Sequence, residues 1–227
     1  MATNKVSKQE ITEPDKLQVL LGEIRDYVLT HKRNLAVVTA MVLVVIVSIG
    51  GWSYYRQTEE TKAMNLYNKA VMDTFRIGKA PQDAAAAVKP LQEVIEKYSA
   101  TEAALLAQYR IGNAYLNAGQ IDAARKAFQG YLRDKSEENE LTILVYNALG
   151  NCYEAENDYK NALAQYEKAL NAKAGKPFAG DILANLARTY EAMKDNKRAS
   201  EYYQKALDKT QDPAIKLIIG RKIAILG

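Results

Sequence analysis

The strongest constraint on this chain is a pattern that occurs three times. A Leu or Ile followed by a small residue stands at Ile111-Gly112, Leu149-Gly150 and Leu186-Ala187, at intervals of 38 and 37 residues. Counted from the small residue, Tyr follows at +3, Ala at +12, Phe or Tyr at +16, and Tyr or Ala at +19 in every block. A polar turn divides each block into two stretches, so the pattern predicts three antiparallel helix pairs.

The small residues of the pattern indicate that the two helices of each pair approach closely. Glycine inside a helix is less favourable than alanine by about 0.5–1 kcal/mol, so Gly112 and Gly150 need a packing reason. The second helix offers a matching small residue at +12, for example Ala162 opposite Gly150. The aromatic residues at +3 and +16 are expected to fill the space around this contact.

This spacing resembles the tetratricopeptide repeat, whose Leu-Gly, Tyr, Ala, Phe or Tyr, and Ala positions are all present. The resemblance covers residues 105–213, although Gln108, Tyr146 and Leu183 replace the tryptophan of the repeat's first helix. It implies an all-α fold, a right-handed α-solenoid.

The segments before and after the repeats resemble incomplete helix pairs. Residues 57–104 are predicted to form a degenerate leading helix pair with a turn at Gly78 and Pro81. Leu91 stands in register with Phe128, and Pro90 should kink or restart the second helix. Residues 214–227 are predicted to form a closing helix that covers the last repeat, as the end of a solenoid requires.

A long apolar segment precedes the repeats. Residues 35–52 carry no charge, and as a helix they would be about 27 Å long, close to the hydrocarbon thickness of a bilayer. A cleaved signal peptide usually has a shorter apolar region and a shorter basic start. We therefore predict a transmembrane helix at 34–56. Basic residues before it, such as Lys32 and Arg33, favour a cytoplasmic amino terminus and an exported carboxyl-terminal domain.

Residues 1–33 are predicted to be a cytosolic segment with a short amphipathic helix. Thr12 to Asp15 resembles a capping box, and apolar residues at helical spacing follow it. This helix would either lie on the membrane surface or lead directly into the span.

Composition argues against several classes of function. The 31 basic and 27 acidic residues are nearly balanced, which does not suggest nucleic-acid binding. Cys152 is the single cysteine and His31 the single histidine, so neither a zinc site nor a histidine-based catalytic relay is expected. No glycine-rich phosphate-binding pattern occurs. We therefore expect no enzyme, no cofactor and no metal.

The order of the parts resembles a more particular family, the YfgM-like ancillary subunits of the bacterial SecYEG translocon. The residues that carry this resemblance are "GGWSYYRQ" after the apolar segment and "QDPAIKLIIGRKIAIL" at the end. It implies a single-pass protein of the bacterial inner membrane with a periplasmic domain. The partners that it implies are the SecYEG translocon, a membrane-anchored periplasmic chaperone and unfolded exported clients.

The resemblance to tetratricopeptide proteins also indicates where partners would bind, because their first helices line the concave face. The residues next to the packing stripe would form this first-helix face: Tyr109, Asn113, Asn117, Asn147, Asn151, Glu154, Arg188 and Glu191. Asparagine is a poor helix former whose amide can both donate to and accept from an extended peptide. An ordinary solvated helix face, and an adaptor that binds no clients, are the alternatives. The lysines of a carboxylate clamp are missing.

The apolar segment generates a first prediction about topology. A reporter that is active only in the periplasm, fused after Gly227, should be active in a bacterial host, because the basic flank retains the amino terminus in the cytosol. Reporter activity on plates and in cell fractions measures this. A fusion that is inactive there, although full-length and membrane-bound, would reverse the proposed orientation.

Overall fold

The computed structural model describes residues 16–76, 84–135 and 137–226, and these residues form only helices, turns and connecting segments. The chain divides into two compact units, Met1–Gln57 and Thr58–Gly227. Each unit is described by itself.

The first unit contains helix α1 (Lys16–Thr30) and the beginning of α2 (Lys32–Arg76). The apolar side chains of α1, among them Leu20, Ile24 and Tyr27, are exposed. The capping box predicted at residues 12–15 lies outside the described residues. Within the described part of the chain, one helix is long and apolar enough to cross a membrane, and no residue of its apolar window is buried.

Helix α2 continues without a break beyond the predicted end of the apolar span at residue 56. No Gly or Pro occurs between Ser53 and Arg76, so nothing in this sequence interrupts the helical hydrogen bonds. The apolar helix and the first helix of the leading pair are therefore one element of 45 residues.

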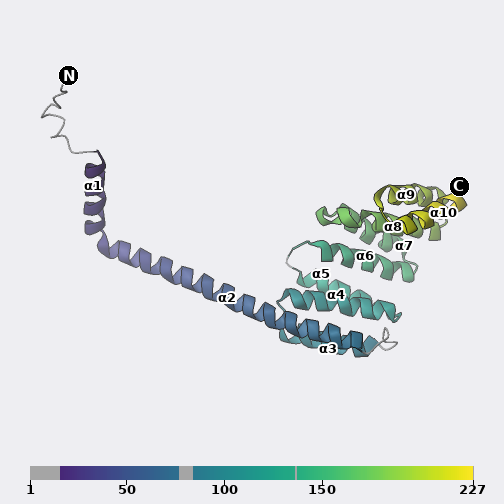
Figure 1. Cartoon of the computed structure of the whole chain (residues 1–227), viewed down its shortest axis with the longest axis horizontal. Helices are drawn as coiled ribbons and strands as arrows, with labels where there is room; N and C mark the ends of the chain where they lie inside the picture. The colour runs from purple at the N-terminus through teal and green to yellow at the C-terminus, as the bar shows by residue number, and fades with distance from the viewer. Residues whose placement is uncertain (1–15, 77–83, 136, 227) are drawn as a thin grey trace, which may run out of the picture. The chain divides into compact units, whose positions relative to one another are not determined.

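The second unit is a stack of helices (Figure 1). After the last part of α2 come α3 (Ala84–Lys97) and then three helix pairs. The pairs are α4 (Glu102–Asn117) with α5 (Ile121–Asp134), α6 (Glu140–Ala155) with α7 (Tyr159–Asn171), and α8 (Ala179–Ala192) with α9 (Asn196–Lys209). A 3₁₀ segment, η1 (Lys173–Phe178), precedes α8, and α10 (Pro213–Leu226) ends the stack. The predicted all-α solenoid is confirmed.

The small residue of the first two pairs lies directly under an aromatic ring. A Cβ atom added to Gly150 would lie 2.3 Å from the ring of Tyr166, and one added to Gly112 would lie 2.4 Å from the ring of Phe128. The small residue therefore makes room for the aromatic ring at +16. The expected contact residue at +12, Ala162 in the second repeat, is fully buried as well, but the atoms nearest to a Cβ at Gly150 are those of the Tyr166 ring.

The leading pair packs against α4 through one apolar cluster. Ala63, Tyr67 and Ala70 of α2 share this cluster with Leu91 and Val94 of α3. Its predicted turn at Gly78 and Pro81 lies outside the described residues.

A side chain of α2 caps the start of α4. The Glu60 carboxylate accepts hydrogen bonds from the backbone N–H groups of Glu102 and Ala103, at 2.9 and 3.0 Å, and so caps the start of α4. Pro90 lies inside α3, so of the two expected effects, a kink or a restart of the helix, the restart does not occur.

The closing helix α10 covers the last repeat with only one of its faces. Ile219 is buried, and Ile215, Ile223 and Leu226 pack against the same cluster as the third repeat. Leu217 and Ile218, which belong to the apolar sequence of the same helix, are 58% and 60% exposed.

The contact between Gly150 and Tyr166 generates a second prediction. Gly150→Leu should lower the free energy of unfolding by about 1–3 kcal/mol, because the ring of Tyr166 occupies the space that the new side chain needs. Denaturant unfolding followed by circular dichroism measures this change.

Two further variants test whether the destabilisation comes from the contact between position 150 and Tyr166. Gly130→Leu is the matched control, since a Cβ at Gly130 would make only ordinary contacts of 3.7 Å or more. The double variant Gly150→Leu/Tyr166→Ala should be less unstable than the sum of the single changes. Additive effects would show that the leucine and the ring do not meet.

Candidate protein-interaction face

The first-helix face carries a hydrogen-bonded cluster between the second and third repeats. The Tyr166 hydroxyl donates to Glu154 Oε2 at 2.9 Å and to Asn151 Oδ1 at 2.7 Å. Arg188 of the next repeat donates from Nε to Glu154 Oε1 at 2.8 Å, and from Nη2 to Asn151 Oδ1 at 3.1 Å. Three of the predicted face residues, Asn151, Glu154 and Arg188, are therefore brought together, and they join α6 to α8.

The same arrangement recurs one repeat later. The Tyr203 hydroxyl donates to Glu191 Oε2 at 2.8 Å, and Lys222 Nζ of α10 donates to Glu191 Oε1 at 2.7 Å. In both repeats a glutamate at +4 therefore accepts from the tyrosine at +16 of its own repeat and from a cation of the next helix. We call these two groups the Glu154 cluster and the Glu191 cluster.

The first repeat has neither the acceptor nor the donor of this arrangement. Its +4 position is Leu116 and its +16 position is Phe128, so an apolar pair replaces the glutamate and the tyrosine. Among the residues that the structure describes, neither Asn113 nor Asn117 has a side-chain hydrogen-bond partner. Asn117 is exposed and Asn113 is half-buried.

Two further face residues have different surroundings. Asn147 accepts a hydrogen bond from Asn185 Nδ2 of α8 at 2.8 Å, which is another link between the second and third repeats. Tyr109 is half-buried, and its ring lies 6.1 Å from that of Phe128. The eight predicted residues therefore form two groups. Those of the later repeats are hydrogen-bonded to other side chains, and those of the first repeat, which we call the open group, have no side-chain hydrogen bond in the described structure: Tyr109, Asn113 and Asn117.

Burial and hydrogen bonding control the protonation of these clusters. Burial raises the pKa of Tyr166, and the neighbouring Glu154 carboxylate raises it further, so the phenol keeps its proton and remains a donor. Burial alone would raise the pKa of Glu191, but hydrogen bonds from Lys222 and Tyr203 lower it below its usual 4.5.

Cys152 lies on α6 beside these clusters, with its side chain turned into the core. It is fully buried. Burial raises the pKa of its thiol to about 11, so the thiol stays protonated and reacts slowly.

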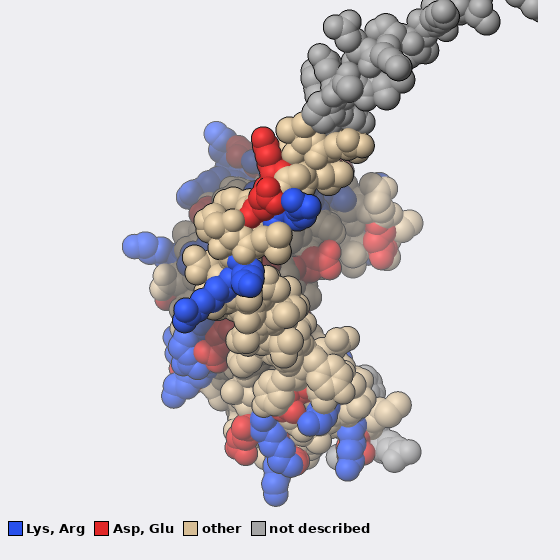
Figure 2. Space-filling model, turned by 90° about the vertical axis from the view of Figure 1, so that its left-hand side faces the viewer, with Lys and Arg blue, Asp and Glu red and all other residues tan. Residues whose placement is uncertain are grey.

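Charges of both signs are interspersed over the surface that Figure 2 shows, with no large patch of one sign on that face. Within the described ranges, no group of three or more His, Cys, Asp or Glu is placed to hold a metal ion. The chemistry on the first-helix face is that of amide, carboxylate, guanidinium and phenol groups, which suits hydrogen bonding to another polypeptide.

A stack of paired helices, with a glycine under an aromatic ring in the first two pairs, defines a tetratricopeptide-like protein. The sequence comparison agrees: the chain belongs to the family described as tetratricopeptide repeat-like domain, whose match covers residues 30–227. No protein in the curated set matches the chain.

Several solved structures share this fold. PilF of Pseudomonas aeruginosa is 20% identical, with a TM-score of 0.56 over 74% of this chain and 68% of PilF. The MamA protein is 16% identical, with a TM-score of 0.54 over 74% of this chain and 80% of MamA. BtubC from P. vanneervenii is 14% identical, with a TM-score of 0.56 over 75% of this chain and 82% of BtubC. At these identities the likeness concerns the fold alone.

Four residues that form hydrogen bonds to the predicted face were not predicted to do so. Tyr166 and Tyr203 were assigned to the core, and Lys222 and Asn185 were not singled out. A signal was present, because the +4 and +16 positions change together: Leu with Phe in the first repeat, and Glu with Tyr in the two that follow. That pairing indicates a contact between the two positions.

The lowered pKa of Glu191 generates a third prediction. A carboxylate with a lowered pKa in the folded state stabilises the fold above its unfolded value of 4.5, and this stabilisation is lost as the pH falls through the lower folded value. The urea midpoint of the parent should therefore fall from about pH 6 to about pH 3 more steeply than that of Glu191→Gln.

The matched control is Glu201→Gln, which changes an exposed glutamate on α9. This variant should keep the pH slope of the parent. If the parent and Glu191→Gln have the same slope, the Glu191 cluster does not contribute to stability.

Proposed function

We propose that this chain is a protein-interaction module anchored in the bacterial inner membrane, which assists exported proteins or their chaperones at the Sec translocon. The family membership supports a role in binding other proteins. The apolar part of α2 supports a membrane anchor. The resemblance to YfgM-like subunits supports the translocon, the periplasmic location and the chaperone partners.

The observation that carries the proposal is the open group on the first-helix face. In the described structure, the amides of Asn113 and Asn117 are not used by other side chains, whereas Asn147 and Asn151 are. An extended peptide has unpaired backbone N–H and C=O groups that an amide can both donate to and accept from. The first repeat is therefore the place where a client would bind.

Tethering compensates for the weak binding that such a face allows. A shallow polar surface orders its ligand at an entropic cost, so its affinity for a peptide is low. A membrane anchor that holds the domain beside the exit of the translocon would raise the effective concentration of emerging clients to about the millimolar range. Weak, reversible contacts suit a module that has to release its clients.

One observation favours a second function, a scaffold of another envelope assembly or cell-division machine that binds no clients directly. The predicted face residues of the later repeats are all hydrogen-bonded internally: Asn147, Asn151, Glu154, Arg188 and Glu191. This leaves only a short open face for a peptide. A scaffold would contact a folded partner through another surface.

Photocrosslinking in cells separates these functions and provides a fourth prediction. A photoreactive residue at position 117 should crosslink to many exported proteins, which appear as a heterogeneous smear on a gel. Asn113→Ala should reduce this yield about twofold to tenfold, because it removes a hydrogen-bonding group worth about 0.5–1.5 kcal/mol. Alanine is the better helix former, so helicity should be unchanged.

The matched control is Asn171→Ala, which changes an exposed asparagine at the end of α7. It should leave the yield at the level of the parent. A single discrete band in place of the smear would favour the scaffold, and an unchanged smear in Asn113→Ala would remove the first repeat as the client site.

A further inference from the structure

Arg110 of α4 is held beside the first-helix face by a neutral partner, the hydroxyl of Tyr67. Its Nε donates a hydrogen bond to this hydroxyl, and its guanidinium carbon lies 5.7 Å from the centre of the Tyr67 ring. Tyr67 belongs to α2 and is buried, whereas Arg110 is exposed. The tyrosine therefore fixes the position of the guanidinium without neutralising its charge.

The other arginines of this part of the stack have carboxylate partners. The sequence from 102 to 209 contains five arginines. Four of them form salt bridges with an aspartate or a glutamate: Arg125, Arg133, Arg188 and Arg198. Arg110 forms no salt bridge with any residue that the structure describes, and within the same ranges only its Nε has a hydrogen-bond partner. Its two terminal nitrogens, which carry four N–H groups, are therefore open to a ligand.

The sequence around the contact between Arg110 and Tyr67 contains no acidic residue. Neither residues 61–72 of α2 nor residues 103–121 around α4 include an aspartate or a glutamate. The positive charge of Arg110 is therefore not compensated by its neighbours along either helix.

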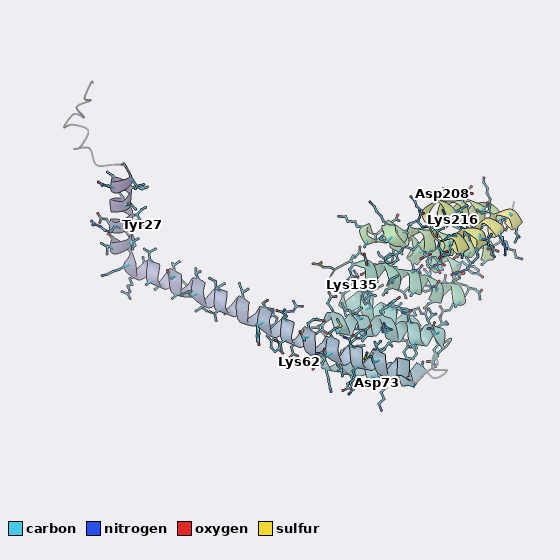
Figure 3. The ribbon with its side chains drawn as sticks, viewed as in Figure 1. Tyr27, Lys62, Asp73, Lys135, Asp208 and Lys216 are labelled. Atoms are coloured by element: carbon cyan, nitrogen blue, oxygen red, sulfur yellow. The ribbon has the colours of Figure 1, made fainter. Side chains whose placement is uncertain are left out.

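The two acidic residues that bound this part of α2 do not compensate Arg110 either. The Glu60 carboxylate is bound to the backbone N–H groups at the start of α4. Asp73, which Figure 3 shows near the end of α2, stands six residues after Tyr67. It therefore lies about 9 Å farther along the helix and about 120° around it.

Arg110 stands on the same side of α4 as the open amides. At about 100° per residue, Arg110, Asn113 and Asn117 fall within about 60° of one another over two helical turns. A peptide that pairs with these amides therefore passes the guanidinium. The residues that correspond to Arg110 in the second and third repeats are Ala148 and Asn185, so the cation is particular to the first repeat.

We propose that the clients of the first-helix face are extended segments with an acidic side chain, and that Arg110 binds this carboxylate beside the open amides. This inference rests on the proposed function, because it names the clients that the open group selects. The two terminal nitrogens of Arg110 would each donate to one carboxylate oxygen, while the amides bind the peptide backbone. An acidic side chain is favoured over a backbone C=O group, because it also neutralises the guanidinium charge.

The carboxyl terminus of a client has the same chemistry but fits the site less well. The lysines of a carboxylate clamp are missing from this face, so one guanidinium is the cation that remains. An exported chain also presents its carboxyl terminus last, whereas acidic side chains emerge throughout its export. The experiment below therefore distinguishes side-chain from terminal carboxylates.

A pair of matched peptides tests the proposal. The full chain in nanodiscs of zwitterionic lipid, with a photoreactive residue at position 117, is crosslinked to short extended peptides capped at both ends. The two peptides differ only in a central glutamate or glutamine, and the yield as a function of peptide concentration gives an apparent affinity. The glutamate peptide should bind about threefold to tenfold more tightly at low salt, as expected for one partly exposed, two-pronged ion pair. This preference should shrink as salt is added.

Three variants assign the preference to Arg110. Arg110→Gln should bind both peptides equally, and its thermal unfolding midpoint shows whether the domain is still folded. Tyr67→Phe keeps the buried ring but removes the hydroxyl that holds Nε, so the preference should be smaller than in the parent. Arg133→Gln is the matched control, because it removes the same charge from an exposed position on α5, and it should keep the preference of the parent.

Four outcomes would overturn the proposal. If both peptides crosslink to the parent with equal affinity, the face binds clients without selecting acidic ones, and the proposed function stands. If neither peptide crosslinks, the proposed function is wrong as well. A preference that survives unchanged in Arg110→Gln would assign the carboxylate to another cation. An Arg110-dependent gain that is larger for a glutamine peptide with a free carboxyl terminus than for the capped glutamate peptide would assign Arg110 to chain ends.

Discussion

The ring of Tyr166 lies over Gly150, and much of the solenoid depends on this type of contact. Because a glycine allows the ring to approach the first helix, the two helices of a pair can pack closely. The same side chain then extends its hydroxyl to Asn151 and Glu154 on the first-helix face. One residue therefore sets the crossing within its own repeat and holds the acceptor that binds Arg188 of the next. Tyr203 has the corresponding position one repeat later, with Lys222 as the cation.

Much of the fold could be predicted from the sequence, because the repeat imposes the same packing problem three times. Identical offsets to Tyr115, Tyr153 and Tyr190 required the same helix pair in each block, and the glycines showed that the pairs cross closely. The contact that requires a glycine at these positions was harder to predict. Periodicity places Ala162 and Tyr166 on the same face of α7, but it does not say which of them reaches Gly150. Helix α2 extends to Arg76 because no Gly or Pro between Ser53 and Arg76 interrupts it.

The candidate site was harder to predict, because the same residue types serve binding and internal packing. Asn113 and Asn151 occupy the same position in successive repeats, yet Asn151 accepts two hydrogen bonds from Tyr166 and Arg188 while Asn113 has no partner in the described structure. The difference arises at another position, where Phe128 replaces tyrosine and so offers no hydroxyl. Face residues that look equivalent in the sequence therefore differ in their hydrogen bonding, because residues at other positions decide which of them have a partner. Asn147 and Asn151 are hydrogen-bonded between the second and third repeats, whereas Asn113 and Asn117 have no side-chain partner in the described structure.

Different residues hold the successive junctions between repeats, so the stack would unfold from one end first. In a solenoid each repeat contacts only its neighbours, so local stability follows the strength of each junction. The last junction contains the Glu191 cluster, whose pairing with Lys222 is lost as the pH falls through the lowered pKa of Glu191, whereas the first repeat has Leu116 and Phe128 in the corresponding positions. Mild acid would therefore loosen α10 from the third repeat first. The amides of Asn113 and Asn117 lie at the other end of the repeats, so the open face would survive this partial unfolding.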